Sequence, residues 1–248
     1  MISIQNLFFR YGHKNILQDI NLQINKCDFW AIFGANGTGK TTLLKLMAKQ
    51  LEGYSGTILL NDKKLNDYKQ KEIASIIGYM PQKILFSMPY TVREFLEISM
   101  YSNTHINKET NAYQETLQLF KLQKFENNLI YQLSGGELQR LLLASVYIQE
   151  TEIICLDEPL NFLDPAFTQL TMSILDTLYF EKQKTIVMVM QHWQSLYFSK
   201  IFSQVKVLML KDNKIYFSGA IKEALPMFED YFEVKLNKIK DGNTQYLL

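Results

Sequence analysis

The chain has 248 residues, 47% of them hydrophobic, and its 26 Lys and Arg against 25 Asp and Glu leave a net charge of +1. This length and composition are typical of a globular protein with one large domain, and the near-neutral net charge supplies no overall basic character that would attract nucleic acid. The sequence has no run of about eighteen apolar residues, so we expect no membrane-spanning helix, and residues 1–6 alternate like a strand rather than resembling a signal peptide.

The chain contains two cysteines, Cys27 and Cys155. Both stand in or beside apolar segments that are expected to be core strands. We therefore expect free, buried thiols in a reducing cytosolic compartment, rather than a disulfide or a metal site.

The first 24 residues are predicted to form a β-hairpin. Residues 2–9 and 17–24 alternate apolar and polar side chains, and residues 11–14 form the turn between them. Tyr11 stands at this turn. Its ring is either a surface aromatic or a platform on which a nucleotide base stacks, and its position alone does not decide between the two.

A phosphate loop follows the hairpin. The segment Gly34–Thr41 fits the pattern G-x-x-x-x-G-K-[ST], after an apolar strand at residues 30–33 and before a helix that starts near Thr41. The glycines let backbone N–H groups approach a polyphosphate, and the positive end of the helix adds to the attraction. Lys40 is expected to reach the β- and γ-phosphates and Thr41 to hold Mg²⁺. The residues predicted to bind the nucleotide here are Gly34, Asn36, Gly37, Gly39, Lys40, Thr41 and Thr42.

The next segment alternates strands with polar chain. Residues 56–60 and 76–80 are predicted strands, and the lysine-rich residues 62–71 between them are predicted to be a solvated face. Pro81 ends the second strand because proline cannot donate to a sheet. Gln82, just past that strand, is either an exposed loop residue or a ligand of magnesium and water.

Residues 91–127 change to helical periodicity, with apolar residues spaced for one helical segment near residue 95 and another near residue 117. No glycine and proline linker separates this region from the rest of the chain. We interpret it as a helical insert in the same domain.

The segment 133–140 reads Leu-Ser-Gly-Gly-Glu-Leu-Gln-Arg. Ser134 and Glu137 have the spacing of a capping box at the start of a helix that continues to Ile148. A capping box does not explain Gly135 and Gly136, because each glycine in a first helical turn costs about 1 kcal/mol relative to alanine. The bare backbone indicates a second anion site at this helix end.

Two carboxylates end the apolar strand at residues 153–157. Next to a phosphate loop, Asp157 is expected to bind Mg²⁺ and Glu158 to act on the attacking water.

A further apolar strand, residues 185–190, ends just before His192, which is either a polar residue at a strand end or a contact to the γ-phosphate. A hairpin of residues 205–211 and 214–218 is predicted to close the core.

Taken in order, these motifs resemble the ATP-binding subunit of ABC transporters over nearly the whole chain. The segment 133–140 is the most specific of them, and Asp-Glu-Pro at residues 157–159 follows it. The resemblance implies an ATPase that works as a head-to-tail homodimer, in which the phosphate loop of one subunit and the 133–140 segment of the other enclose ATP. It implies the following roles: adenine stacking for Tyr11, Mg²⁺ contact for Thr41, Gln82 and Asp157, γ-phosphate binding across the dimer for Ser134, Gly135 and Gly136, general base for Glu158, γ-phosphate contact for His192, and coupling of the two sites for Asp164. Lys40 and Gln82 join Glu158 and His192 as the catalytic set.

The resemblance also implies a fold and a partner. The fold is an α/β, RecA-like P-loop NTPase core (residues 1–82 and 151–225) with an N-terminal antiparallel β-subdomain, an inserted α-helical subdomain (83–150) and a C-terminal tail (226–248). The partner is an integral membrane permease, with a substrate-binding protein involved indirectly and no nucleic acid. The subunit is then cytoplasmic and peripheral on the inner face of the cell membrane.

The subfamily is indicated by residues 89–94 and by the tail from Ala224 to Gly242, which look like those of bacterial importer ATPases for iron siderophores, haem or cobalamin. Zinc and manganese importer ATPases are similar, and a soluble ATPase of iron-sulfur assembly has a similar length. Two features depart from the pattern. Residues 99–102 replace a Gly-Arg pair, and Trp193 follows His192 where aspartate is usual.

Overall fold

The structure is a computed structural model that describes residues 1–84, 88–101, 111–232, 238–241 and 244–247. Its helices are α1 (Lys40–Met47), α2 (Gln70–Ile76), α3 (Val92–Met100), α4 (Ala112–Leu119), α5 (Gly135–Ile148), α6 (Pro165–Phe180) and α7 (Ile221–Phe232). Short 3₁₀ helices are η1 (Leu65–Asp67), η2 (Gln123–Phe125), η3 (Ile130–Gln132), η4 (Trp193–Phe198) and η5 (Lys200–Gln204). Within the described ranges, no helix combines the length and apolar character that crossing a bilayer requires.

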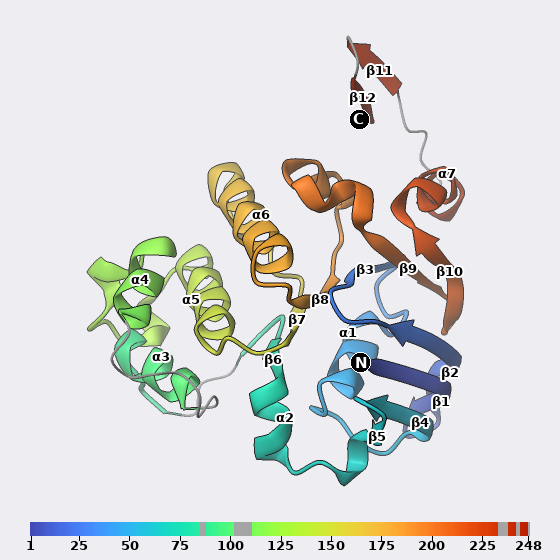
Figure 1. The fold of residues 1–248 in the computed structure, drawn as a ribbon, viewed down its shortest axis with the longest axis horizontal. Helices are drawn as coiled ribbons and strands as arrows, with labels where there is room; N and C mark the ends of the chain where they lie inside the picture. The colour runs from blue at the N-terminus through green and yellow to red at the C-terminus, as the bar shows by residue number, and fades with distance from the viewer. Residues whose placement is uncertain (85–87, 102–110, 233–237, 242–243, 248) are drawn as a thin grey trace.

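A six-stranded sheet forms the centre of the molecule, in the order β10-β9-β3-β8-β7-β6 (Figure 1). Its strands are β3 (Phe29–Gly34), β6 (Ile77–Met80), β7 (Ile153–Asp157), β8 (Thr185–Val189), β9 (Lys206–Lys211) and β10 (Lys214–Ala220). All neighbours pair in parallel except β9 and β10, which form the predicted hairpin at the edge. Because parallel strands end at the same edge of a sheet, the chain segments that follow β3, β6, β7 and β8 lie together there.

A second, antiparallel sheet has the order β2-β1-β4-β5. It consists of β1 (Ile2–Tyr11), β2 (Lys14–Ile24), β4 (Ser55–Leu60) and β5 (Lys63–Lys64). The hairpin predicted from the first 24 residues is confirmed, and Gly12 makes its turn with φ of 55°. A last hairpin pairs β11 (Lys238–Asp241) with β12 (Thr244–Leu247).

Strand β3 is buried on both sides because its alternate residues enter two different cores. Trp30 and Ile32 pack with α1 and the antiparallel sheet. Ala31 and Phe33 pack with α5, α6 and α7 on the opposite face. This double covering is the arrangement that a parallel α/β sheet requires. The predicted α/β P-loop NTPase architecture with an N-terminal antiparallel sheet is confirmed.

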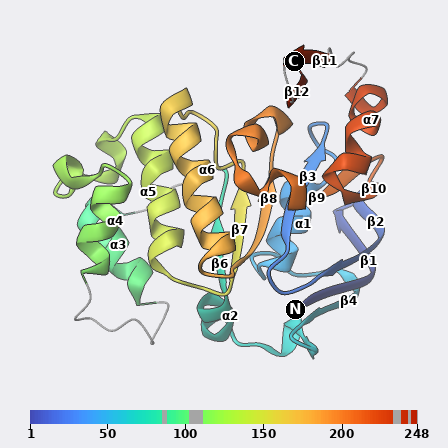
Figure 2. The same ribbon diagram turned by 45° about the horizontal axis from the view of Figure 1, so that its top comes forward.

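The helical region lies at one end of the molecule. Figures 1 and 2 both show α3 and α4 beside α5, away from the antiparallel sheet. Helix α3 starts at a capping box between Thr91 and Glu94, as its sequence favours. Helix α5 contributes to the core on the sheet as well, through Leu141 and Ala144. The helical region is therefore continuous with the rest of the fold.

The polar segment 62–71 contains β5, η1 and the start of α2, and its four lysines are exposed, as predicted for a solvated face. Two local expectations differ from the structure. Residue 226, the expected start of the tail, lies inside α7, whose Phe228 is fully buried. Cys27 is partly exposed in a turn, whereas Cys155 is buried in β7, and both are free thiols. Ser102, and Glu233, Val234 and Gly242 of the tail, lie outside the described residues.

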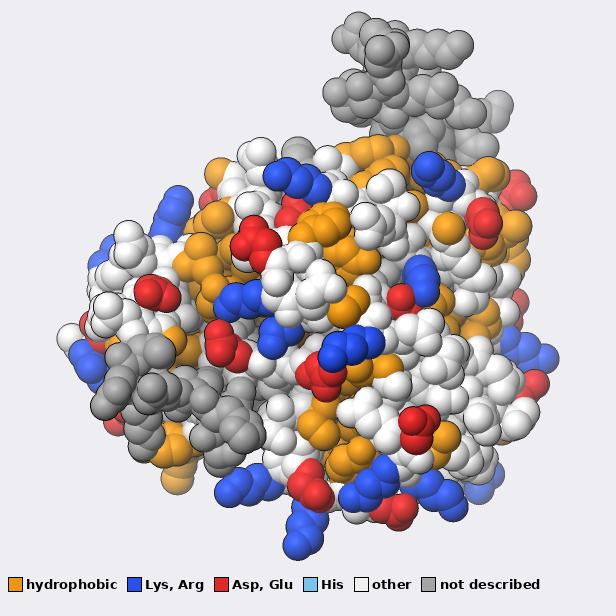
Figure 3. Space-filling model, in the orientation of Figure 1, with side chains coloured by type: hydrophobic (Ala, Val, Ile, Leu, Met, Phe, Trp, Pro, Cys, Tyr) orange, Lys and Arg blue, Asp and Glu red, His pale blue; other side chains and the backbone are white. Residues whose placement is uncertain are grey.

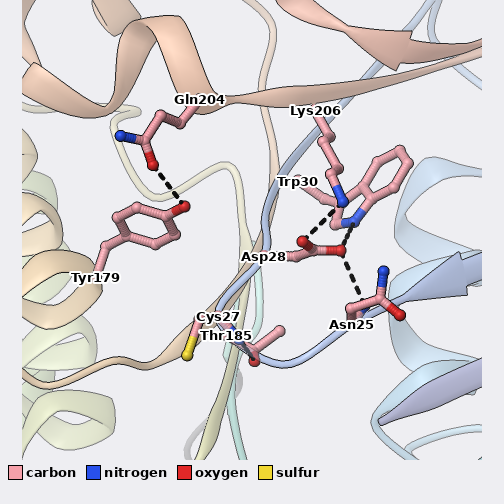
Figure 4. Close-up of polar contacts among 8 residues, drawn as sticks. All are labelled: Asn25, Cys27, Asp28, Trp30, Tyr179, Thr185, Gln204 and Lys206. Carbon is pink, nitrogen blue, oxygen red and sulfur yellow. Dashed lines mark hydrogen bonds and ion pairs between the residues drawn. The ribbon is translucent and has the colours of Figure 1, made fainter.

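A polar network fixes the start of β3, at the end of the strand opposite the phosphate loop. Figure 4 shows the carboxylate of Asp28 accepting from the backbone N–H of Asn25 (2.8 Å), the indole Nε1 of Trp30 (3.2 Å) and the ammonium of Lys206 (2.7 Å). Asp28 is buried, so these three donors satisfy a charge that would otherwise be costly to bury. The network ties β9 to β3.

The surface carries charges of both signs. Figure 3 shows Lys and Arg side chains interspersed with Asp and Glu over the face in view. This distribution agrees with the net charge of +1. That face therefore has no large positively charged patch of the kind that binds nucleic acid.

Candidate functional site

The loop Gly34–Gly39 joins the end of β3 to the start of α1, as its motif predicts. Gly37 and Gly39 have φ of 81° and 99°, in the region that favours glycine. A Cβ atom on Gly39 would stand 2.8 Å from the carbonyl oxygen of Ile16 and 2.7 Å from a methyl of Leu17, both in β2. The antiparallel sheet therefore packs directly against the loop. Asn36 in the loop is exposed, and Thr42 is buried in the first turn of α1.

The side chain of Lys40 turns back over this loop and is only 6% exposed. Its ammonium donates to the carbonyl oxygens of Gly34 (2.7 Å) and Ala35 (3.0 Å). Burial lowers the pKa of Lys40, and the nearby charges of Glu158 and Asp157 oppose this shift. An anion placed at the loop would stabilise the charge of this buried ammonium, whose two partners are neutral carbonyls.

Asp157 ends β7 directly beside the start of α1. The hydroxyl of Thr41 donates to its Oδ1 at 3.0 Å, while its buried Oδ2 has no hydrogen-bond partner among the described residues. Burial raises the pKa of Asp157, and the hydrogen bond from Thr41 opposes this shift. A buried carboxylate oxygen without a partner, next to a hydroxyl, fits a hard cation such as Mg²⁺.

The described residues contain no cluster of three or more His, Cys, Asp or Glu side chains that would cage a metal. Mg²⁺ is usually held by one or two protein groups together with substrate phosphates and water. The pair Asp157 and Thr41 therefore fits a magnesium ion that arrives with a phosphate, rather than a metal that the protein holds alone.

Glu158 follows Asp157 in a left-handed backbone conformation, with φ of 53°, and is 6% exposed. Its Oε2 accepts from the amide of Gln82 (2.6 Å) and from the amide of Asn161 (2.5 Å). Its backbone carbonyl accepts from the buried amide of Gln139 (3.0 Å). The carboxylate is thus fixed from two sides, by the segment after β6 and by the turn after β7.

Asn161 and Gln139 were not among the predicted site residues. Asn161 lies three residues after Glu158, in a turn where the N–H of Asn161 donates back to the Glu158 carbonyl (3.3 Å). Its Pro-Leu-Asn context is a turn signal that points to this contact. Gln139 reaches Glu158 from α5, and no local pattern in the sequence indicates that contact.

His192 lies just past β8 and is exposed. It lines a cavity of about 210 Å³ together with Glu158, Asn161 and Ser195. The structure thus places His192 and Glu158 at the same cavity. The unusual Trp193 is buried, with its ring 5.8 Å from Phe228 of α7 and 5.4 Å from Tyr197, so it anchors the segment that carries His192.

The predicted second anion site lies at the start of α5. Ser134 caps the helix, and its backbone N–H donates to the Glu137 carboxylate (2.8 Å), which completes the predicted capping box. A Cβ atom on Gly136 would stand 3.1 Å from the carbonyl of Phe162, which explains the small residue. Ser134, Gly136 and Asp164 line a cavity of about 320 Å³. Gly135 is exposed beside it.

Asp164 caps α6, since its Oδ1 accepts from the backbone N–H of Phe167 at 2.8 Å. The neighbouring Phe162 is 73% exposed, with φ of 63°. The cavity at Asp164 shares no lining residue with the cavity at Glu158 and His192. The chain therefore carries two separate polar sites.

Tyr11, at the end of β1, has a ring that is 50% exposed. The ring lies nearly perpendicular to that of Phe9, with centroids 4.9 Å apart. A half-exposed ring at this turn fits the base-stacking role that the resemblance implies.

Comparison with known proteins agrees with this geometry. The model of a family described as "ABC transporter" matches residues 17–161. The petrobactin import ATP-binding protein FpuC of Bacillus anthracis is 30% identical over 96% of this chain and 88% of its own length. The hemin import ATP-binding protein HmuV of Rhizobium etli is 31% identical over 91% of this chain and 87% of its own length.

Among solved structures, the chain resembles the ATP-binding cassette MJ0796, which was solved as a dimer bound to ADP and Pi. The TM-score is 0.76 at 24% sequence identity, and the match covers 89% of this chain and 99% of the other. At this identity the likeness establishes the fold.

Proposed function

Since the chain belongs to the ABC transporter family of ATP-binding proteins, we propose that it is the ATPase subunit that powers import of an iron complex across a membrane. The observation that carries the ATPase part is one hydrogen-bonded cluster at the edge of the sheet. In it, Thr41 contacts Asp157, and Gln82 contacts Glu158, beside the buried ammonium of Lys40. These groups supply the positive charge, the oxygen ligands and the base that phosphoryl transfer to water needs.

Each residue has a distinct task in this proposal. Lys40 exchanges its two carbonyl partners for the β- and γ-phosphates of ATP, which stabilises an ammonium that is otherwise poorly solvated. Glu158 accepts a proton from the attacking water as it moves toward the γ-phosphate. The amides of Gln82 and Asn161 hold the Glu158 carboxylate, so the base is oriented before the substrate arrives.

Asp157, Thr41 and Gln82 are the residues that would hold Mg²⁺. When bound, this ion neutralises charge on the β- and γ-phosphates. The buried Oδ2 of Asp157 gains a partner by this arrangement, which supports the assignment. His192 extends the same cavity and is assigned to the γ-phosphate.

We propose that two copies of the chain bind ATP between them, head to tail. Each chain carries a phosphate loop and, at a separate cavity, the bare backbone of Gly135 and Gly136 at the start of α5. A second copy brings this helix end to the γ-phosphate, where its N–H groups and positive dipole end stabilise the charge. The exposed Phe162, next to that cavity, is then covered by the partner.

The names of the relatives support the transport part of the proposal. FpuC is named for petrobactin import and HmuV for hemin import, and both align over most of their length. We infer that the present chain joins a membrane permease on the cytoplasmic face and drives uptake of an iron siderophore or haem. A substrate-binding protein would deliver that cargo to the permease.

Deleting the chain from its native cell is expected to reduce uptake of a radioactively labelled ferric siderophore or haem to the level of a strain that lacks the permease. ATP turnover drives the import step, so a plasmid copy of the wild-type chain should restore uptake. A copy carrying Glu158→Gln should fail to restore it. Uptake of iron complexes and of zinc would be measured in parallel in each strain.

The zinc measurement separates the alternatives. Unchanged uptake of zinc together with lost uptake of an iron complex supports the proposal. Loss of zinc uptake with normal iron uptake would contradict the assigned cargo while leaving the ATPase intact.

A further inference from the structure

Helix α7 reaches the phosphate loop from the C-terminal part of the chain. The hydroxyl of Tyr231 accepts from the backbone N–H of Ala35 (2.9 Å) and donates to the carbonyl oxygen of Leu210 in β9 (2.6 Å). One side chain therefore connects α7, the central sheet and the second residue of the loop. These three segments are about 20 or more residues apart in sequence.

The position of this hydroxyl is defined by the sheet. Strands β3 and β9 pair in parallel from Trp30 with Lys206 to Gly34 with Leu210, and there the pairing ends. The Tyr231 hydroxyl lies between the next two backbone groups, the Leu210 carbonyl and the Ala35 N–H. It uses its one donor and one acceptor to bridge these two backbone groups directly beyond the last paired residues.

The peptide group that Tyr231 holds is also the one that holds Lys40. The N–H of Ala35 and the carbonyl of Gly34 belong to the same planar peptide unit. The N–H donates to Tyr231, and the carbonyl accepts from the Lys40 ammonium at 2.7 Å. Fixing one end of a rigid plane fixes the other, so the Tyr231 hydroxyl sets the direction of the carbonyl that orients Lys40.

From this geometry we propose that Tyr231 is a positioning residue for the phosphate loop, which acts through the Gly34–Ala35 peptide to keep the loop and Lys40 in the arrangement that receives ATP. This inference rests on the proposed binding of ATP at the loop. A loop that is already held in one arrangement loses less conformational entropy when it binds ATP. Without the hydroxyl, the Ala35 N–H loses the partner that holds this peptide in place, and the affinity for ATP falls.

The anchoring of α7 itself does not depend on this hydroxyl. Phe228, one turn earlier, is fully buried, and its ring packs edge to face on Phe33 of β3 with centroids 5.0 Å apart. The Tyr231 ring also lies 5.6 Å from that of Tyr216 in β10. Removing only the Tyr231 oxygen leaves both ring contacts in place, so Tyr231→Phe should fold.

The test compares Tyr231→Phe with Tyr216→Phe in the full chain. Both variants lose one phenolic oxygen from the same aromatic pair, but only Tyr231 bonds to the loop. A fluorescent ATP analogue gives the Kd, a titration of ATP gives KM and kcat, and thermal unfolding gives Tm. From the net worth of one hydrogen bond, we expect Tyr231→Phe to raise Kd and KM by about threefold to tenfold, while kcat at saturating ATP stays near wild type and Tm falls by no more than a few degrees. Tyr216→Phe should match the wild type.

The outcomes are distinguishable. If the wild-type chain binds no ATP, the proposed function fails. If the wild type binds ATP and Tyr231→Phe binds it equally well, the positioning role is overturned. An equal loss of affinity in Tyr216→Phe, or a lower Tm of Tyr231→Phe with unchanged KM, would also overturn it, because either result assigns the effect to general packing.

Discussion

Replacing Glu158 by Gln is expected to lower ATP turnover by about two to four orders of magnitude, the range that a general base contributes. The variant should still bind ATP, because Lys40 and the loop are unchanged. Gln keeps an oxygen that accepts from Gln82 and Asn161, so the local structure should persist. What is lost is a side chain basic enough to take a proton from water. Phosphate release under steady-state conditions measures the effect.

A variant that binds ATP but hydrolyses it slowly should remain as the dimer that holds ATP between its two copies. With ATP and Mg²⁺, Glu158→Gln is therefore expected to elute as a dimer in size-exclusion chromatography, whereas the wild type returns to monomer as it hydrolyses. Glu181→Gln makes the same chemical change at an exposed position at the end of α6 and should behave as wild type. Undiminished turnover in Glu158→Gln would show that another group activates the water.

Replacing Gly39 by Ala is expected to damage both the fold and ATP binding. At φ of 99° an alanine is strained, and its Cβ would stand 2.8 Å from the backbone oxygen of Ile16. A backbone carbonyl in a paired strand has little room to shift. Strain and overpacking together should cost about 2–4 kcal/mol, which lowers Tm by roughly 5–15 °C in a domain of this size.

Gly37→Ala is the matched control for that variant. Gly37 also has positive φ (81°), but an added Cβ would meet no atom within 4 Å. Only the conformational cost remains there, about 1 kcal/mol, with a shift in Tm of a few degrees. Equal destabilisation by the two alanines would contradict the close contact between β2 and the loop.

Local motifs predicted the elements that carry the candidate site, because the geometry of these elements is set by neighbouring residues. Gly34–Thr41 specifies a strand, a tight turn and a helix within one segment, and the structure has β3, the loop and α1 there. The capping box of Ser134 and Glu137 and the proline at the start of α6 likewise define helix starts without help from distant residues.

Residues that act through tertiary contacts were not accessible from the sequence. The amide of Gln139 reaches Glu158 only because α5 packs over the end of β7. Tyr231 meets Ala35 from 196 positions away. The start of α2 at the end of segment 62–71 was likewise not predicted, because the buried Ile73 anchors that helix on the core. The departure at Trp193 was visible in the sequence, but its packing on Phe228 required the fold.

In this account the ATPase works on a membrane permease. The most direct test is to purify the tagged chain from detergent-solubilised native membranes, identify the proteins that accompany it and assay ATP hydrolysis in the same fraction. We expect a polytopic membrane protein to co-purify and the fraction to hydrolyse ATP. If only water-soluble partners accompany an active ATPase, the transport assignment is contradicted and a role in assembling another cellular component takes its place.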